Sequence, residues 1–124
     1  HTLVFGTVYG DIHDIGKNIV KSVLKPFGYN IIDLGKSVTK EAFAAKAKEV
    51  NADIIGISAL MTTTMVNLEP TIEHIKSELP NVKIIVGGAV VTEDYAKKVG
   101  ADGYSKDAIK AIGLVKSLTE VDEK

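Results

Sequence analysis

Short apolar runs and amphipathic helical segments alternate five times along this chain, and this alternation restricts the possible folds more than any other feature. The apolar runs are rich in β-branched residues and predict strands at Thr2–Tyr9, Tyr29–Leu34, Asp53–Ser58, Val82–Val86 and Ala101–Tyr104. Strands that alternate with helices indicate a parallel sheet covered on both faces and connected by right-handed crossovers. We therefore expect an α/β protein with a doubly wound, flavodoxin-like five-stranded sheet, in the order 2-1-3-4-5 and in three α/β/α layers.

The segments between these runs carry helix signals. Thr39 and Thr92 are placed to cap helices, and Val38 and Phe43 have the spacing of a hydrophobic staple. The polar tail 119–124 is expected to fray. Apolar periodicity and the positions of Gly and Pro predict helices over residues 15–27, 39–50, 65–79, 92–100 and 106–118.

Composition excludes several classes of protein and of site. The 124 residues are enough for one domain, and the 15 basic and 16 acidic residues form no stripe that would suit nucleic acid or a membrane surface. The absence of cysteine excludes disulfides, thiolate zinc sites and Cys nucleophiles, and is compatible with the cytoplasm, where we expect the protein. No apolar run approaches the ~18 residues of a membrane span. Because the chain starts at His1, directly before a strand, we expect that an N-terminal part precedes it.

Three loops that follow predicted strands have unusual sequences. In the order 2-1-3-4-5 the switch point lies between strands one and three, and ligands bind outside the carboxyl ends of the strands. The loops there are Gly10–Gly16 and Ser58–Thr64, and Gly87–Gly88 follows the next strand. We therefore expect a ligand site where these loops meet.

The first loop places an imidazole between two carboxylates. Asp11, His13 and Asp14 are metal-ligating residue types, but no third nitrogen or sulfur donor lies nearby in the sequence. A free ion such as zinc takes three or four protein ligands, so a lone histidine cannot hold one tightly. One histidine can, however, supply an axial ligand to a metal held by a macrocycle, with a carboxylate fixing its tautomer. A structural interpretation stays open, in which Asp11 or Asp14 caps the next helix and His13 is a solvated loop residue.

The other two loops also have both a functional and a structural interpretation. The hydroxyls of Ser58–Thr64 suit hydrogen bonds to a polar ligand, with Leu60 as an apolar contact, but the segment can equally be a turn in which a threonine caps the next helix. The Gly87-Gly88-Ala89 segment either removes side chains where a flat group approaches the backbone or forms a tight strand-to-helix turn.

Taken together, the motifs Asp11-x-His13-x-x-Gly16, Ser58-x-Leu60 and Gly87-Gly88 resemble those of the cobalamin-binding (B12-binding) domain family. The resemblance covers essentially all of residues 1–124, which we expect to be one corrinoid-binding domain. The finer match is to the corrinoid proteins of methanol, methylamine and methoxyaryl methyltransferase systems, and to the B12 domain of methionine synthase.

The resemblance implies a role for each motif residue. His13 would be the lower axial ligand of cobalt in a base-off, His-on arrangement, and Asp11 would accept the other imidazole N–H. The hydroxyl that completes this relay in the family falls on Thr64, where methionine synthase has serine. The remaining residues would line the channel for the displaced nucleotide tail or contact the cofactor: Ile12, Asp14, Ile15, Gly16, Ser58, Leu60, Thr62, Gly87, Gly88, Ala89, Tyr104, Ser105 and Asp107.

The implied function is that of a carrier rather than a catalyst. The domain would be a non-catalytic subunit of a methyltransferase system that carries a methyl group on cobalt, between a methyl-donor methyltransferase and tetrahydrofolate or a thiol. Members of this group usually have an N-terminal helical cap over the corrin, which is absent from this chain. The exposed edge would then face a partner methyltransferase or a second copy in a homodimer.

Other function classes fit the motifs less well. A receiver domain needs an Asp at the end of strand three, where this chain has Ser58, and a flavodoxin-type phosphate loop disagrees with the acidic first loop. A serine hydrolase needs a Gly-x-Ser-x-Gly elbow, and this chain has Leu60 in place of the last glycine. The strongest alternative is a B12-binding module of an adenosylcobalamin mutase or of a B12-dependent sensor or regulator.

Overall fold

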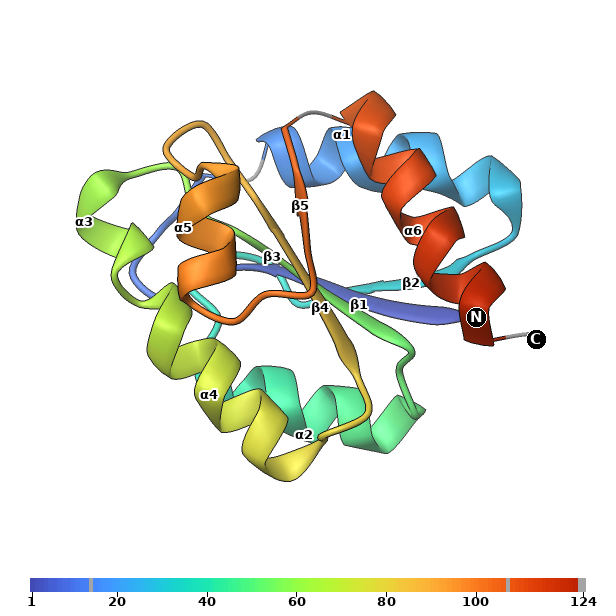
Figure 1. Ribbon diagram of the computed structural model, residues 1–124, viewed down its shortest axis with the longest axis horizontal. Coiled ribbons are helices and arrows are strands. Elements are labelled where there is room, and N and C mark those ends of the chain that lie inside the picture. The colour runs from blue at the N-terminus through green and yellow to red at the C-terminus, as the bar shows by residue number, and fades with distance from the viewer. Residues whose placement is uncertain (14, 107, 123–124) are drawn as a thin grey trace.

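A computed structural model describes residues 1–13, 15–106 and 108–122. Its strands form one all-parallel sheet in the order β2-β1-β3-β4-β5, which confirms the expected topology (Figure 1). The strands are β1 Thr2–Thr7, β2 Asn30–Asp33, β3 Ile54–Ser58, β4 Lys83–Gly87 and β5 Gly103–Ser105.

Helices cover both faces of this sheet and so complete the three expected layers (Figure 1). One face packs against α1 and α6, and the other packs against α2, α4 and α5, with α3 beside them. The helices are α1 Ile15–Leu24, the 3-10 turn η1 Lys25–Phe27, α2 Lys40–Val50, α3 Thr62–Met65, α4 Leu68–Glu78, α5 Glu93–Lys98 and α6 Ala108–Asp122. No helix in the described ranges is both long and apolar enough to cross a membrane.

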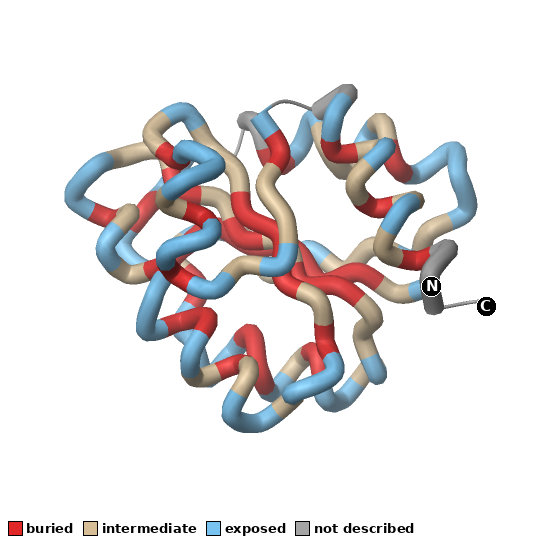
Figure 2. The backbone as a smooth tube through the Cα atoms, viewed as in Figure 1, coloured by how far each residue is buried: buried red, intermediate tan, exposed pale blue. Residues whose placement is uncertain are grey.

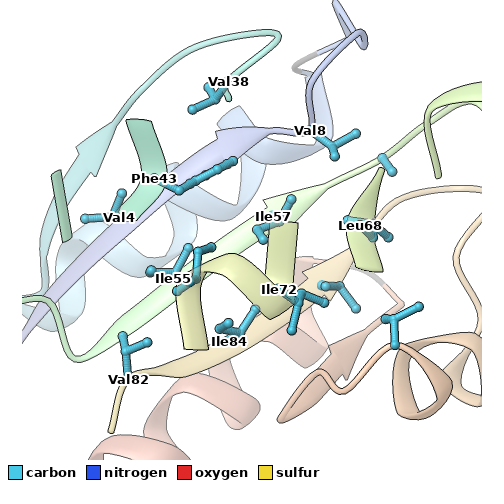
Figure 3. Packing of buried hydrophobic residues seen from close by; sticks show 14 of the residues in the cluster. Val4, Val8, Val38, Phe43, Ile55, Ile57, Leu68, Ile72, Val82 and Ile84 are labelled. Atoms are coloured by element: carbon cyan, nitrogen blue, oxygen red, sulfur yellow. The ribbon is translucent and has the colours of Figure 1, made fainter. Parts of the chain in front are cut away.

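Side-chain alternation along the strands divides the core into two clusters. Leu3 and Phe5 of β1 point toward α1 and α6, whereas Val4 points to the opposite face and packs in the larger cluster with Phe43 of α2 and Ile72 of α4 (Figure 3). Burial therefore concentrates on the strands and on the inner sides of the helices (Figure 2). This arrangement leaves the carboxyl ends of the strands to be covered by loops alone.

Two predicted helix caps are confirmed. Thr39 accepts a hydrogen bond from the Ala42 N–H at 3.1 Å, and Thr92 accepts one from the Tyr95 N–H at 3.1 Å. Each cap satisfies a backbone donor that lacks an intrahelical partner in the first turn.

Other local expectations were wrong. The single helix expected over 65–79 is divided into α3 and α4, and β1 ends at Thr7, two residues earlier than expected. The tail does not fray over Thr119–Asp122, because these residues continue α6. Thr119 is buried, and its hydroxyl lies 3.2 Å from the Tyr29 hydroxyl, so it anchors the end of α6 to the segment before β2.

Candidate functional site

The three loops singled out by the sequence meet at the carboxyl edge of the sheet. The Leu60 N–H, after β3, donates to Asp11 Oδ2, after β1, at 2.8 Å. The Ala59 N–H donates to the Gly87 carbonyl at the end of β4 at 3.0 Å. The hydrogen bonds join the loops directly, so the three motifs belong to one site.

Asp11 is the centre of this site and is completely buried. Its Oδ1 accepts from the His13 N–H at 3.0 Å and lies 2.8 Å from His13 Nδ1, while its Oδ2 accepts from Leu60 N–H and from the Thr64 hydroxyl at 2.7 Å. Burial raises the pKa of this carboxyl, but the hydrogen bonds from Leu60, His13 and Thr64 outweigh burial and hold the pKa well below its usual range. Asp11 is therefore ionised at neutral pH.

The ionised carboxylate fixes the tautomer of His13. A carboxylate can only accept, so His13 Nδ1 carries a proton, and in the neutral imidazole the lone pair lies on Nε2. The His13 side chain is 52% exposed, and Nε2 has no hydrogen-bond partner within the described part of the chain. Across residues 1–13, 15–106 and 108–122, no group of three or more His, Cys, Asp or Glu side chains is placed to hold a metal ion. The geometry thus offers one oriented imidazole nitrogen.

The threonines after β3 do not cap a helix through their side chains, contrary to one interpretation of this loop. The N-cap of α3 is Met61, without a side-chain cap bond. The Thr64 hydroxyl lies 3.1 Å from the Met61 carbonyl and 2.7 Å from Asp11 Oδ2, and the bond to the charged acceptor is the stronger. The Thr64 hydroxyl therefore holds the Asp11 carboxylate.

A fourth loop, between β2 and α2, supports the site and was missed by sequence reasoning. The Ser37 N–H donates to the Asp11 carbonyl at 2.9 Å, and the Ser37 hydroxyl accepts from the Gly10 N–H at 3.0 Å. Both Gly35 and Ser37 have positive φ angles, at 92° and 49°. The available signal was its position: β2 lies beside β1, so its following loop reaches the same edge.

An ion pair between a buried lysine and an aspartate next to this loop was also missed. The Lys17 side chain is 3% exposed, and its Nζ lies 2.7 Å from Asp33 Oδ1 and donates to the Gly35 carbonyl at 3.1 Å. Lys21 Nζ lies 2.7 Å from Asp33 Oδ2. Burial raises the pKa of Asp33, but the hydrogen bonds from Lys17, Lys21 and the Gly35 N–H lower it to about 2. These contacts hold the start of α1, and with it the end of the histidine loop, against the edge of the sheet.

We expect Asp33 to make the stability of the protein depend on acid pH. Because its pKa falls from about 3.9 unfolded to about 2 folded, its contribution to the free energy of unfolding is fully present above about pH 5 and is lost between about pH 4 and pH 2. Chemical unfolding of Asp33→Asn should therefore show a deficit of about 2 kcal/mol at pH 7 that shrinks at pH 3. Glu49→Gln, which removes a surface pair with Lys46, is the matched control with little expected effect. A deficit for Asp33→Asn that is equal at both pH values would contradict the assignment.

A cavity of about 280 Å³ opens between the sheet and helices α1 and α6, beside the histidine loop. It contains six of the predicted cofactor-binding residues: Ser58, Leu60, Gly87, Gly88, Ala89 and Ser105. The rest of the lining is mostly apolar or glycine and was not predicted: Phe5, Gly6, Lys17, Val20, Gly56, Ile57, Ile85, Val86, Lys106 and Ala111.

The register of the sheet explains the shape of this cavity. Thr7, Ser58, Gly87 and Ser105 are successive register partners across four strands, so they form one row of small residues at the carboxyl edge. Two residues earlier on β1, the Phe5 ring fills the space over Gly56, where a Cβ atom would lie 2.5 Å from the ring. The row of small residues leaves room, and the Phe5 ring closes the space below it.

Gly88 allows the second and third loops to touch. Its φ is 125°, and a Cβ atom there would lie 1.9 Å from the Ala59 carbonyl oxygen, so no other residue fits without movement of the backbone. At Gly87 a Cβ atom would lie 3.0 Å from the Ser105 carbonyl oxygen. Close backbone approach thus requires glycine at position 88 and leaves little room for a side chain at position 87.

The structure places some predicted site residues away from the cavity. Thr62 is exposed at the start of α3, and Ile12 is 67% exposed beside His13. Tyr104 packs against the larger core cluster on the opposite face from Ser105, because neighbouring strand residues point to opposite faces. Gly16 lies in the first turn of α1, as does Ile15. Two further predicted residues, Asp14 and Asp107, lie outside the described residues.

Several known sequences are similar to this chain. A sequence model of the B12 binding domain matches residues 1–113. Dimethylamine corrinoid protein 1 of Methanosarcina acetivorans is 48% identical over 118 residues, which cover 94% of this chain and 55% of that protein. The dimethylamine corrinoid protein of Methanosarcina barkeri is 49% identical with the same coverage. The chain therefore spans about half the length of these curated relatives.

Solved structures agree with the sequence matches. A cobalamin-binding protein from Desulfitobacterium hafniense superimposes with a TM-score of 0.89 at 34% identity, covering 94% of this chain and 58% of that one. The Methanosarcina barkeri monomethylamine corrinoid protein gives 0.88 at 29% identity, with coverage of 94% and 57%. The methanol:cobalamin methyltransferase complex MtaBC of the same organism gives 0.83 at 31% identity, with coverage of 96% and 46%.

Proposed function

This chain belongs to the B12-binding domain family, and on that premise we propose that it binds cobalamin or a related cobamide in the base-off, His-on arrangement, with His13 as the lower axial ligand of cobalt. The observation that carries the proposal is the single imidazole nitrogen oriented by a buried, ionised carboxylate, together with the mostly apolar cavity lined by Leu60, whose N–H donates to that carboxylate. A corrin supplies the four equatorial nitrogens itself, so one protein ligand is enough.

The residues at the site fit such a group. His13 Nε2 has a lone pair and lies in a half-exposed side chain, which suits ligation of a metal that the protein does not enclose. The cavity beside it is open, is lined mainly by apolar side chains and glycines, and has hydroxyls at Ser58 and Ser105. Ser58, Leu60, Gly87 and Gly88 would hold the displaced base, and Ser105 and Ala89 would lie along the tail.

Asp11 and Thr64 would act through His13. The Asp11 carboxylate keeps the proton on Nδ1, and it also stabilises the imidazolium that forms when Nε2 takes up a proton. The Thr64 hydroxyl and Leu60 N–H hold the far oxygen of the same carboxylate, so its position does not depend on His13 alone. His13, Asp11 and Thr64 can therefore together hold or release one proton when His13 Nε2 changes its partner.

Replacing Asp11 by Asn tests this arrangement. Both carboxylate oxygens of Asp11 accept hydrogen bonds, but an asparagine amide has only one accepting oxygen. Its NH₂ group would therefore face a donor, which is either His13 or the pair formed by the Leu60 N–H and the Thr64 hydroxyl. We expect roughly 10- to 100-fold weaker cobalamin binding together with a lower melting temperature. Asp102→Asn is the matched control, because its carboxylate accepts from the Ile84 N–H at 2.8 Å at the opposite edge of the sheet. The Asp102→Asn variant should bind cobalamin as tightly as the wild type does. Cobalamin titration and thermal unfolding measure both effects, and wild-type affinity in Asp11→Asn would contradict the assigned role.

We further propose that the domain is a non-catalytic methyl carrier of a corrinoid-dependent methyltransferase system. A bound cobalt corrinoid supplies a centre that accepts and releases a methyl group. The names of the relatives, dimethylamine and monomethylamine corrinoid proteins and a methanol:cobalamin methyltransferase complex, favour methylamines or methanol as the methyl source. The partners would be a methyl-donor methyltransferase and a second one that passes the methyl group to tetrahydrofolate or a thiol. Residues 1–124 would then constitute the corrinoid domain, and a second copy in a homodimer is a further candidate to cover the corrin.

Reconstitution tests both levels of the proposal. The protein is mixed with cobalamin, the cobalt is reduced to the paramagnetic Co(II) state, and electron paramagnetic resonance is recorded with natural-abundance and ¹⁵N-labelled protein. Histidine ligation predicts that the splitting from the axial nitrogen changes from a triplet to a doublet on labelling; an unchanged triplet means that the cofactor's own base is still bound. Further reduction of the holoprotein to Co(I), followed by incubation with methylamine or methanol methyltransferases and their methyl donors, then tests the carrier role, and size-exclusion chromatography tests the dimer.

A further inference from the structure

Thr7, at the end of β1, is a buried polar residue that no motif includes. It is completely buried, and its backbone is fixed by two hydrogen bonds with the β2–α2 loop: Thr7 N–H to the Gly35 carbonyl at 3.0 Å, and Val38 N–H to the Thr7 carbonyl at 2.9 Å. Its hydroxyl donates to the His13 carbonyl at 3.0 Å. A buried hydroxyl that reaches a loop carbonyl from a fixed strand is well placed to position that loop.

His13 lies in a loop without helical or strand hydrogen bonds, yet both of its backbone polar groups are held by buried side chains. The N–H is held by Asp11 Oδ1 at 3.0 Å and the C=O by the Thr7 hydroxyl. We infer that Thr7 is a positioning residue for the axial ligand: it fixes the backbone of His13, while Asp11 fixes the imidazole. This inference rests on the proposed ligand role of His13.

Because of the direction of the hydrogen bonds, the bond from Thr7 to His13 does not depend on what binds in the cavity. The His13 carbonyl can only accept, so Thr7 must donate to it, and Ser58 Oγ, at 3.4 Å from Thr7 Oγ1, must donate to Thr7. A ring nitrogen in the cavity that accepts from Ser58 would redirect the Ser58 proton but leave the bond from Thr7 to His13 unchanged. Thr7 itself does not line the cavity. Variants of Thr7 and Ser58 should therefore have different effects on ligation and on binding of the tail.

The test is a double-mutant cycle between Thr7 and His13, measured by cobalamin titration of the apoprotein. Thr7→Val removes the hydroxyl with little change of shape and should weaken binding about three- to ten-fold, the usual effect of losing one such hydrogen bond. In the His13→Ala background the same change should have little effect, because there is no ligand left to position. Thr7→Ser retains the hydroxyl and should bind like the wild type. The absorption spectrum of the Thr7→Val holoprotein should also show an increased fraction without the histidine bound.

Two controls separate a positioning role of Thr7 from a general loss of stability. Thr119→Val removes another buried threonine hydroxyl, which donates to the Val115 carbonyl within α6, and should leave binding unchanged even if the melting temperature falls. A loss in Thr7→Val that is equal with and without His13, or a fully histidine-bound spectrum with wild-type affinity, would overturn the role of Thr7. Absence of histidine ligation in the wild type would instead overturn the proposed function.

Discussion

Replacing His13 by Ala is expected to abolish the spectrum of histidine-bound corrinoid and to weaken cobalamin binding by at least about 100-fold. The variant removes the imidazole whose Nε2 is oriented by Asp11, whereas loss of an outer partner such as Asp11 costs roughly 10- to 100-fold. Some binding should survive, because the cavity lined by Ser58, Gly87 and Gly88 is unchanged. Absorption spectra and ¹⁵N-dependent paramagnetic resonance of the reconstituted protein measure the loss.

His74→Ala is the matched control for this result. His74 lies on α4, where its Nε2 is 3.6 Å from Glu78, so its removal takes an imidazole from the surface without touching the three loops. It should give the wild-type spectrum and affinity. A His13→Ala protein whose spectrum is indistinguishable from that of the wild type would exclude His13 as the ligand.

Replacing Ser58 by Leu is expected to weaken cobalamin binding on the order of 100-fold or more. Ser58 lies in the middle of the row of small residues, so the larger side chain enters the space proposed for the detached base. An aromatic base of this kind buries about 150 Å² at about 25 cal/mol per Å², which is worth almost 4 kcal/mol when it is excluded. Cobinamide, which lacks the nucleotide tail, should bind Ser58→Leu as it binds the wild type.

Thr62→Leu provides the comparison. It adds the same side chain four residues later, at an exposed position of α3 that does not line the cavity, so both ligands should bind normally. Equal losses for cobalamin and cobinamide in Ser58→Leu would indicate general damage to the site. Equal affinity for cobalamin in Ser58→Leu and the wild type would place the tail elsewhere.

Two expectations from the sequence differ from the structure for physical reasons. Tyr104 and Ser105 were both expected to contact the cofactor, but a strand sends them to opposite faces, so Ser105 lines the cavity and Tyr104 packs against the larger core cluster. The tail after Leu118 was expected to fray because it is polar, but Thr119 finds partners in Tyr29 and in the preceding turn of its own helix. Polarity alone does not show whether a hydroxyl has a buried partner.

The sequence by itself determined the alternation of five strands with helices, the caps at Thr39 and Thr92, and the three unusual loops that follow strands. These follow from local patterns, since periodicity, capping residues and loops after strands are written in neighbouring residues. It also predicted His13 as a single axial ligand with Asp11 behind it, a role that stays a prediction.

Only the tertiary structure shows the other contacts that hold His13 and Asp11 in place. Leu60 reaches Asp11 across 49 residues of sequence, and Lys17 reaches Asp33 from a different layer. The register of the sheet places Thr7 beside Ser58 and so shapes both the cavity and the support of His13. Such contacts depend on how strands pair and helices pack, which no local pattern encodes.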